Sequence, residues 1–245
     1  MIEIRAVRSV RALSLSAGRV NALDVELLDE LTGALRELAG WGGPLVVTGA
    51  GRVFCAGVDL KRVLAGGADY TTRLIAALSD AFQAMFSYPG PTVAAINGAA
   101  IAGGCVLACA CDRRLISPDA QIGASEVRVG VPFPVAALEV MRYACGDRAE
   151  EVLLGGRNYR GAEAIGSGLA HGVVAEGLLE TAVAQASELG DIPAEAYRHT
   201  KARLRGPTLA RIRESGDIDR EVCQLWGADQ TRQLIADHLQ RLRHR

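Results

Sequence analysis

Long apolar runs, aromatic side chains and blocks of like charge are all scarce in this chain of 245 residues. The longest apolar run, 98–111, is shorter than the roughly 18 residues that a membrane-spanning helix requires. The first residues carry charges throughout and lack the apolar core of a signal peptide. We therefore expect no membrane partner, no secretory leader and a cytoplasmic location.

The charge pattern also argues against nucleic acid as a partner. The formal net charge is −1, and Lys and Arg are not gathered into one block. Nucleic-acid binding generally needs a clustered positive surface that neutralises phosphates. Aromatic residues make up 4% of the chain and apolar residues 49%, so small Ala and Gly side chains supply much of the apolar content. This composition favours one α/β domain with close backbone packing, and burial between subunits would fit the apolar excess.

The six cysteines do not form a metal-binding motif. Cys105 and Cys109 are spaced to share one helix face, and Cys111 follows them. A second Cys pair or a nearby His that would complete four ligands is missing. Because free Cys is often buried as a small apolar side chain, we expect reduced thiols and no bound metal.

Local patterns predict alternating strands and helices. Alternation of apolar and polar residues predicts a hairpin of two strands, 2–7 and 10–15. Asp24 is a good N-cap for a helix, and five leucines follow at helical spacing: Leu27, Leu28, Leu31, Leu35 and Leu38. The stretch 45–48 has no polar face, as expected of a strand covered on both sides of a parallel or mixed sheet.

Further along, we expect a short helix after Leu60 and a longer one over 72–86, separated by a soft segment over 65–69. The stretch 171–174 is expected to be a terminal strand. The residues 209–242 form an amphipathic ending that contains Trp226, and this ending could cover a site or a neighbouring subunit.

The chain is organised around the stretch 93–112. A strand over 93–96 is broken by Asn97 and Gly98, and a buried helix begins at Gly103 and Gly104. Unpaired backbone N–H groups at such a helix start can hold an anion. A phosphate-binding Walker motif is excluded because the required Lys and Ser or Thr are absent, and the dinucleotide glycine spacing is absent as well. Two readings remain, which are a site for a small oxyanion and close helix–strand packing through glycine.

Four landmarks then occur in one order. They are Asn21-Ala22-Leu23-Asp24, the turn 54–60, the strand–turn–helix 97–112, and Glu126 with Gly130 four residues later. Together they resemble the crotonase superfamily, also called the enoyl-CoA hydratase/isomerase family, over nearly the whole chain. The resemblance implies an α/β fold, a spiral of repeated β-β-α units with a core over 1–190. It also implies a C-terminal helical region over 191–245 that covers the site and packs in a homotrimer or a dimer of trimers.

The same resemblance implies an acyl-CoA thioester substrate, and coenzyme A is then part of the substrate rather than a cofactor. The thioester oxygen would accept hydrogen bonds from the backbone N–H groups of Val58 and Gly103, which would stabilise an enolate. Lys61 and Lys201 are candidates for contact with phosphates. The substrate- and CoA-binding positions carried over from the family are Ala56, Asp59, Leu60, Lys61 and Val106.

Only one of the two glutamates of the family's hydratases is kept. Glu126 matches the second, whereas Val106 occupies the place of the first, and the further acid of dienoyl isomerases falls on Pro134. Adding water normally uses two groups, but one carboxylate suffices to move a proton between carbons. The resemblance therefore favours an enoyl-CoA isomerase with Glu126 as single acid/base. Hydration of a trans-2-enoyl-CoA and non-catalytic binding of acyl-CoA remain as alternatives, and the acyl group is not readable from the sequence.

Other polar residues have simpler explanations. Asp112 is expected to hold Arg113 or a neighbouring backbone group. Glu139 lies at a helical position that faces either the pocket or solvent, and His171 is expected to be packed or surface-polar rather than a base.

Overall fold

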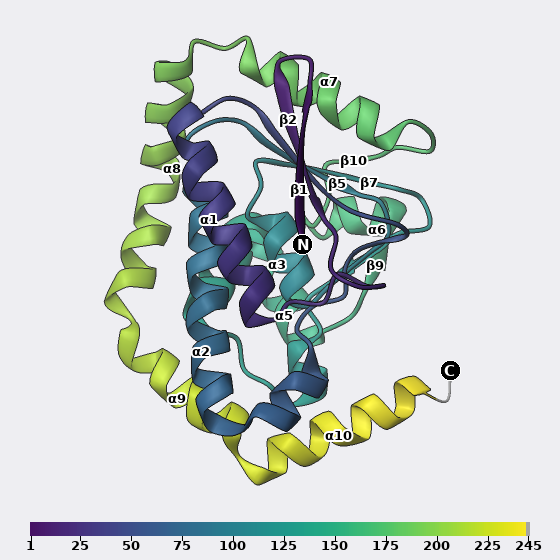
Figure 1. Cartoon of the computed structure of the whole chain (residues 1–245), viewed down its shortest axis with the longest axis vertical. Helices are drawn as coiled ribbons and strands as arrows, with labels where there is room; N and C mark the ends of the chain where they lie inside the picture. The colour runs from purple at the N-terminus through teal and green to yellow at the C-terminus, as the bar shows by residue number, and fades with distance from the viewer. Residues whose placement is uncertain (244–245) are drawn as a thin grey trace.

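The computed structural model describes residues 1–243, and its strands form two sheets (Figure 1). The larger sheet has the order β1-β2-β3-β5-β7-β10, and the smaller one has the order β4-β6-β8-β9. The pairs β1–β2 and β8–β9 are antiparallel, and the other neighbouring pairs are parallel. The strands are β1 (Ile2–Val7), β2 (Val10–Leu15), β3 (Leu45–Gly49), β4 (Val53–Cys55), β5 (Thr92–Ile96), β6 (Ala99–Ile101), β7 (Arg113–Ile116), β8 (Gln121–Gly123), β9 (Tyr159–Arg160) and β10 (Gly172–Val173).

Helices surround these sheets and finish the chain. Figure 1 shows α8 along one side of the molecule and α10 across its lower end, next to α2. The helices are α1 (Val25–Trp41), α2 (Leu60–Phe86), α3 (Gly103–Cys109), η1 (Glu126–Val129), α4 (Val135–Cys145), η2 (Gly146–Arg148), α5 (Ala149–Gly155), α6 (Gly161–Gly166), α7 (Leu178–Gly190), α8 (Ala194–Glu214), α9 (Gly216–Gly227) and α10 (Asp229–Arg243). None of the described helices is both long enough and apolar enough to span a bilayer.

The chain repeats one β-β-α arrangement. In each of the pairs β3–β4, β5–β6 and β7–β8, the first strand enters the larger sheet and the second enters the smaller one, and a helical segment follows. The mixed α/β fold with β-β-α units and C-terminal helices predicted from the resemblance is thus confirmed.

Several local predictions hold because short-range chemistry decides them. The N-terminal hairpin pairs Ile2 with Leu15, as the alternation predicted. The side chain of Asp24 accepts a hydrogen bond from the Leu27 amide at 2.8 Å, which makes it the N-cap of α1. The five leucines of that helix are all buried, so they form the face that packs into the core.

One local expectation needs correction, and another is met within a single helix. Residues 99–101, expected within a turn, form β6, because pairing with β4 and β8 stabilises a strand too short to carry a pattern of its own. The two helices expected over 60–86 are joined in α2, and the break expected over 65–69 is present as a kink at Gly67, where φ is 66° and ψ is −161°.

Candidate active site

Three turns come together at one edge of the smaller sheet. Because β4, β6 and β8 run parallel, their C-terminal ends lie at the same edge. The segments that leave these ends are 56–58, 102–103 and 124–126. The β-β-α repeat therefore brings Val58, Gly103 and Glu126 together from three distant parts of the chain, and all three line one cavity.

The turn that carries Val58 is held in place by the stretch Asn21-Ala22-Leu23-Asp24. The Asn21 side-chain amide donates a hydrogen bond to the Val53 carbonyl at 2.8 Å. Leu23 forms a parallel bridge to Val58, in which the Leu23 amide donates to the Gly57 carbonyl and the Asp59 amide donates to the Leu23 carbonyl. Since backbone groups alternate in direction along an extended segment, the N–H of Val58 points away from Leu23.

The first turn of α3 packs directly against this segment. Gly57 has φ +86°, and a Cβ there would lie 2.8 Å from the Ile101 carbonyl oxygen and 3.6 Å from the Gly103 amide nitrogen. Ala102 adopts φ 51° and ψ −122°, a conformation that non-glycine residues seldom adopt. Such strain is typical of functional turns, and here it sets the direction of the Gly103 N–H. The convergence of the Val58 and Gly103 N–H groups on one substrate oxygen stays a prediction.

Glu126 begins η1, and its carboxyl group is buried. The residue is 6% exposed, and its Oε2 atom has no hydrogen-bond partner in the described protein. Burial raises the pKa of Glu126 to about 8, because the charged form loses its hydration. A carboxyl group in this state is suited to exchanging protons near neutral pH.

The cavity itself is small and mostly apolar. Its volume is about 80 Å³. Helix α2 contributes Leu60, Leu78 and Phe82 to the wall, whereas α9 contributes Trp226 and α10 contributes His238. The remaining lining residues are Ala56, Val58, Ile101, Ala102, Gly103, Ser125, Glu126, Val129, Val131, Pro134 and Ala137.

The predicted substrate-binding positions divide into two groups. Ala56 and Leu60 line the cavity. Asp59 is the N-cap of α2 and accepts from the Lys61 amide at 3.0 Å, while the Lys61 side chain is exposed to solvent. Val106 is fully buried in α3 and is absent from the described lining residues.

Lys201 does not serve as a phosphate contact. Its Nζ atom lies 2.8 Å from both Asp112 Oδ2 and the Gly90 carbonyl oxygen, and the residue is 8% exposed. Burial lowers the pKa of Lys201 to about 8, although the charge of Asp112 partly offsets that effect. These two acceptors and its burial hold the Lys201 side chain in the interior, so the prediction is wrong for Lys201.

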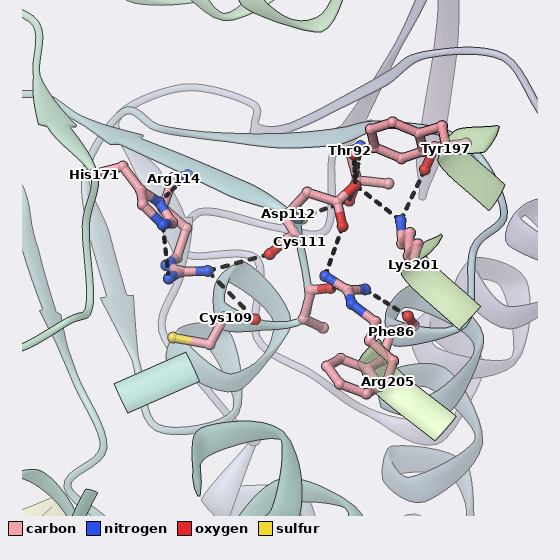
Figure 2. Close-up of polar contacts among 12 residues, drawn as sticks. Phe86, Thr92, Cys109, Cys111, Asp112, Arg114, His171, Tyr197, Lys201 and Arg205 are labelled. Atoms are coloured by element: carbon pink, nitrogen blue, oxygen red, sulfur yellow. Dashed lines mark hydrogen bonds and ion pairs between the residues drawn. The ribbon is translucent and has the colours of Figure 1, made fainter. Parts of the chain in front are cut away.

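Asp112 holds helix α8 rather than Arg113 (Figure 2). Arg205 Nη2 lies 2.6 Å from Asp112 Oδ1, and the Tyr197 hydroxyl lies 2.9 Å from Asp112 Oδ2. Burial raises the pKa of Asp112, but the charges of Lys201 and Arg205 outweigh this and leave it lowered. The Asp112 carboxylate therefore links α8 to the segment that follows α3. The expected hydrogen bonds to the neighbouring backbone are also present, at Thr92 N.

Glu139 faces neither the cavity nor open solvent. Its carboxylate pairs with Arg142 at 2.9 Å and with Arg211 of α8 at 2.5 Å, and its side chain is 7% exposed. The Nδ1 atom of His171 accepts a hydrogen bond from the Arg114 backbone amide at 3.1 Å. His171 is not among the described residues that line the cavity. The described residues also contain no group of His, Cys, Asp and Glu that could hold a metal ion.

Sequence patterns did not identify the cavity residues that the long helices contribute, among them Leu78, Phe82, Trp226 and His238. The ending that contains Trp226 was expected to cover a site or a neighbouring subunit. Trp226 is 2% exposed within its own chain, and its Nε1 donates to the Pro132 carbonyl at 2.9 Å. The amphipathic pattern over 209–242 indicated that these helices bury one face. The pattern did not indicate which surface would cover that face.

Comparisons with known proteins agree with this fold. The family model described as Enoyl-CoA hydratase/isomerase matches residues 6–233. A putative enoyl-CoA hydratase from Thermus thermophilus is 34% identical over 220 residues, which cover 82% of this chain and 87% of that protein. A probable enoyl-CoA hydratase from Mycobacterium tuberculosis is 35% identical, over 83% of this chain and 82% of that protein. The structure of human mitochondrial delta3-delta2-enoyl-CoA isomerase superposes with a TM-score of 0.94 at 26% identity, covering 99% of this chain and 98% of that one.

Proposed function

Because this chain belongs to the enoyl-CoA hydratase/isomerase family, or crotonase superfamily, whose members are enzymes acting on CoA thioesters, we propose that it shifts the double bond of an enoyl-CoA. Glu126 is the single acid/base, and the Val58 and Gly103 N–H groups form the oxyanion hole. The observation that carries this proposal is the burial of an unpartnered Glu126 oxygen in the cavity that Val58 and Gly103 also line.

The proposed reaction moves one proton between two carbons. The Glu126 carboxylate takes a proton from the carbon between the thioester carbonyl and the 3,4 double bond. The electron pair moves onto the thioester oxygen, where two N–H donors stabilise the dienolate. The Glu126 carboxyl then returns its proton to the fourth carbon, so the double bond reaches the 2,3 position and the enzyme is restored.

The surroundings of Glu126 support its role. The hydrogen next to a thioester is only weakly acidic, so a carboxylate with an ordinary pKa is a poor base for it. Desolvation in the apolar cavity raises the pKa of Glu126 to about 8 and strengthens the carboxylate as a base.

Hydration of a 2-enoyl-CoA is the second candidate, and the printed names of the Thermus and mycobacterial relatives favour it. Glu126 is the only carboxylate among the described residues of the cavity wall. A hydratase mechanism therefore needs another group to hold the water. Incubating the purified protein with matched 2-enoyl and 3-enoyl thioesters separates the candidates, because hydration adds the mass of one water and isomerisation adds none. Binding without either product would instead show an inactive acyl-CoA binder.

We also propose that residues 191–245 act as a covering and assembly unit, in a homotrimer or a dimer of trimers located in the cytoplasm. Trp226 and His238 of this region line the cavity. Leu204 on α8 is 62% exposed, and Ile192 just before that helix is 42% exposed. Contact with another copy of the chain would cover these apolar side chains.

A further inference from the structure

The proposed reaction gives the cavity a direction. The thioester oxygen would lie at the Val58 and Gly103 N–H groups. The second and fourth carbons would both lie at Glu126, because its carboxyl group exchanges a proton with each of them. The fifth carbon and those after it would then lie beyond Glu126, on the side away from the oxyanion hole. The wall on that side decides how long an acyl chain the cavity accepts.

The wall beyond Glu126 is built from apolar residues that follow it in the chain. These lining residues are Val129, Val131, Pro134 and Ala137. Trp226 of α9 also lines the cavity and lies against the same segment, since its Nε1 donates to the Pro132 carbonyl at 2.9 Å. A wall of this kind favours a hydrocarbon chain, because burying such a chain removes apolar surface from water.

Trp226 is held firmly in this position. Its helix is docked on the start of α4, where the Val135 amide donates to Asp219 Oδ1 at 2.8 Å. Val222, four residues before Trp226, is 4% exposed, and Trp226 itself is 2% exposed. The indole is thus fixed at its N–H by Pro132 and packed over its remaining surface. A longer chain could displace it only by breaking these contacts.

Helix α2 closes the part of the cavity next to the oxyanion hole. A Cβ on Gly103 would lie 3.7 Å from Phe82 Cζ and 3.9 Å from Leu78 Cδ2. Both side chains therefore pack against the turn that carries the Gly103 N–H, and both are buried. Since this side is filled, the acyl chain extends toward Trp226.

The volume of the cavity limits the number of carbons. It is about 80 Å³, and a group the size of a water needs roughly 10–15 Å³ of such space, so roughly five to eight groups fit. The sulfur, carbon and oxygen of the thioester take about three of these places, which leaves roughly two to five for further carbons. The space is therefore filled by an acyl chain of about six carbons.

We propose that the substrates are short enoyl thioesters of about four to six carbons, and that Trp226 is the residue that stops longer chains. The inference rests on the proposed function, since Glu126 and the oxyanion hole set the direction of the chain. Trp226 acts here on substrate choice and takes no part in the proton transfer.

The test follows binding rather than turnover, so it does not depend on the proton transfer. Calorimetry measures the affinities of saturated butanoyl-, hexanoyl-, octanoyl- and decanoyl-CoA for the wild type and three variants. Trp226→Leu enlarges the cavity at its end wall, and Ala137→Leu fills the cavity from α4. Trp41→Leu is the control, because Trp41 is 43% exposed and is absent from the described lining residues of this cavity.

For the wild type, we expect affinity to rise roughly fourfold per carbon up to hexanoyl-CoA, because each buried methylene adds to binding. Affinity should rise no further with octanoyl-CoA. Trp226→Leu should move this limit about two carbons or more toward longer chains. Ala137→Leu should move it to butanoyl-CoA, and Trp41→Leu should match the wild type.

Affinity that keeps rising to decanoyl-CoA in the wild type would overturn the inference, and so would the same limit in the wild type and Trp226→Leu. If Trp226→Leu does not fold, Ala137→Leu decides, and an unchanged limit in that variant would overturn the inference as well.

Turnover of a 3-enoyl-CoA, measured separately, tests the proposed function. A limit that Trp226→Leu relieves, found without turnover, would support Trp226 as the end wall and reject isomerisation. Turnover without such a limit would reject only the role of Trp226, whereas a wild type that binds none of the four thioesters would reject both proposals.

Discussion

Gly57 packs on the first turn of α3 so closely that a Cβ added to it would lie 3.6 Å from the Gly103 amide nitrogen. The same Cβ would lie 2.8 Å from the Ile101 carbonyl oxygen, which is too close for an unstrained contact. This packing joins the two turns that carry the proposed oxyanion-hole donors. A side chain at position 57 must therefore push the two turns apart.

We expect Gly57→Ala to lower kcat/KM by a factor on the order of a hundred, as the loss of one oxyanion donor does. The close contact between the new Cβ and the Ile101 carbonyl oxygen should also lower the free energy of unfolding. We expect about 1–3 kcal/mol beyond the cost of the positive φ. Gly51→Ala is the matched control, because Gly51 has φ +74° with no atom near its Cβ position. Urea unfolding and steady-state kinetics of both variants check this, and equal activity in the two would contradict it.

Glu126 should make the folded state less stable as pH rises. The raised pKa means that the folded protein binds this proton more tightly than the unfolded chain does. The resulting stability is fully present below the ordinary pKa of a glutamate, 4.5, and is lost as pH rises to about 8.

Glu126→Gln cannot titrate, so its free energy of unfolding should lack this dependence. Between pH 5 and pH 8, the wild type should lose on the order of 3 kcal/mol relative to that variant. Glu150→Gln, at an exposed position of α5, should follow the wild type. Parallel unfolding curves for wild type and Glu126→Gln across this range would show that the carboxyl group is not desolvated.

Asp112 should be a large contributor to stability without taking part in catalysis. Asp112→Asn leaves Lys201 and Arg205 buried without their counter-charge, which typically costs about 3–5 kcal/mol. The control is Glu195→Gln in the same helix, since its pair with Arg198 is exposed and should contribute about 0–1 kcal/mol. Denaturant unfolding of both variants measures the difference, and a small effect at Asp112 would mean that α8 is held by other contacts.

Assembly should depend on the exposed apolar side chains of the C-terminal region. Light scattering at micromolar concentration is expected to give the mass of a trimer or of a dimer of trimers. Leu204→Glu places a charge on the 62% exposed position of α8 and should shift the mass toward the monomer. A monomeric wild type would leave the exposed side chains unexplained and contradict the assembly proposal.

The sequence predicted well those features that depend on interactions between residues close together in the chain. The cap at Asp24 and the hairpin 2–15 depend on neighbouring residues, and both formed as predicted. The three turns of the site were predicted from the order of motifs, and the parallel pairing of β4, β6 and β8 brings them together.

The errors arose where distant contacts decide the outcome. Lys201 has the pattern of a surface residue, but Asp112, 89 positions earlier, draws it into the interior. Likewise, the position of His238 depends on how α10 packs against Gly130 and α2. Helical spacing identifies a buried face, but it does not identify the partner of that face.

The central claim is that Glu126 moves the proton in a cavity that binds the thioester by other means. Glu126→Gln keeps the size of the side chain but removes the base, so acyl-CoA affinity measured by calorimetry should persist. Turnover of the best 3-enoyl-CoA found for the wild type should fall by a factor on the order of a hundred or more. Full turnover in Glu126→Gln would contradict the account, because the proton would then have to move through another group.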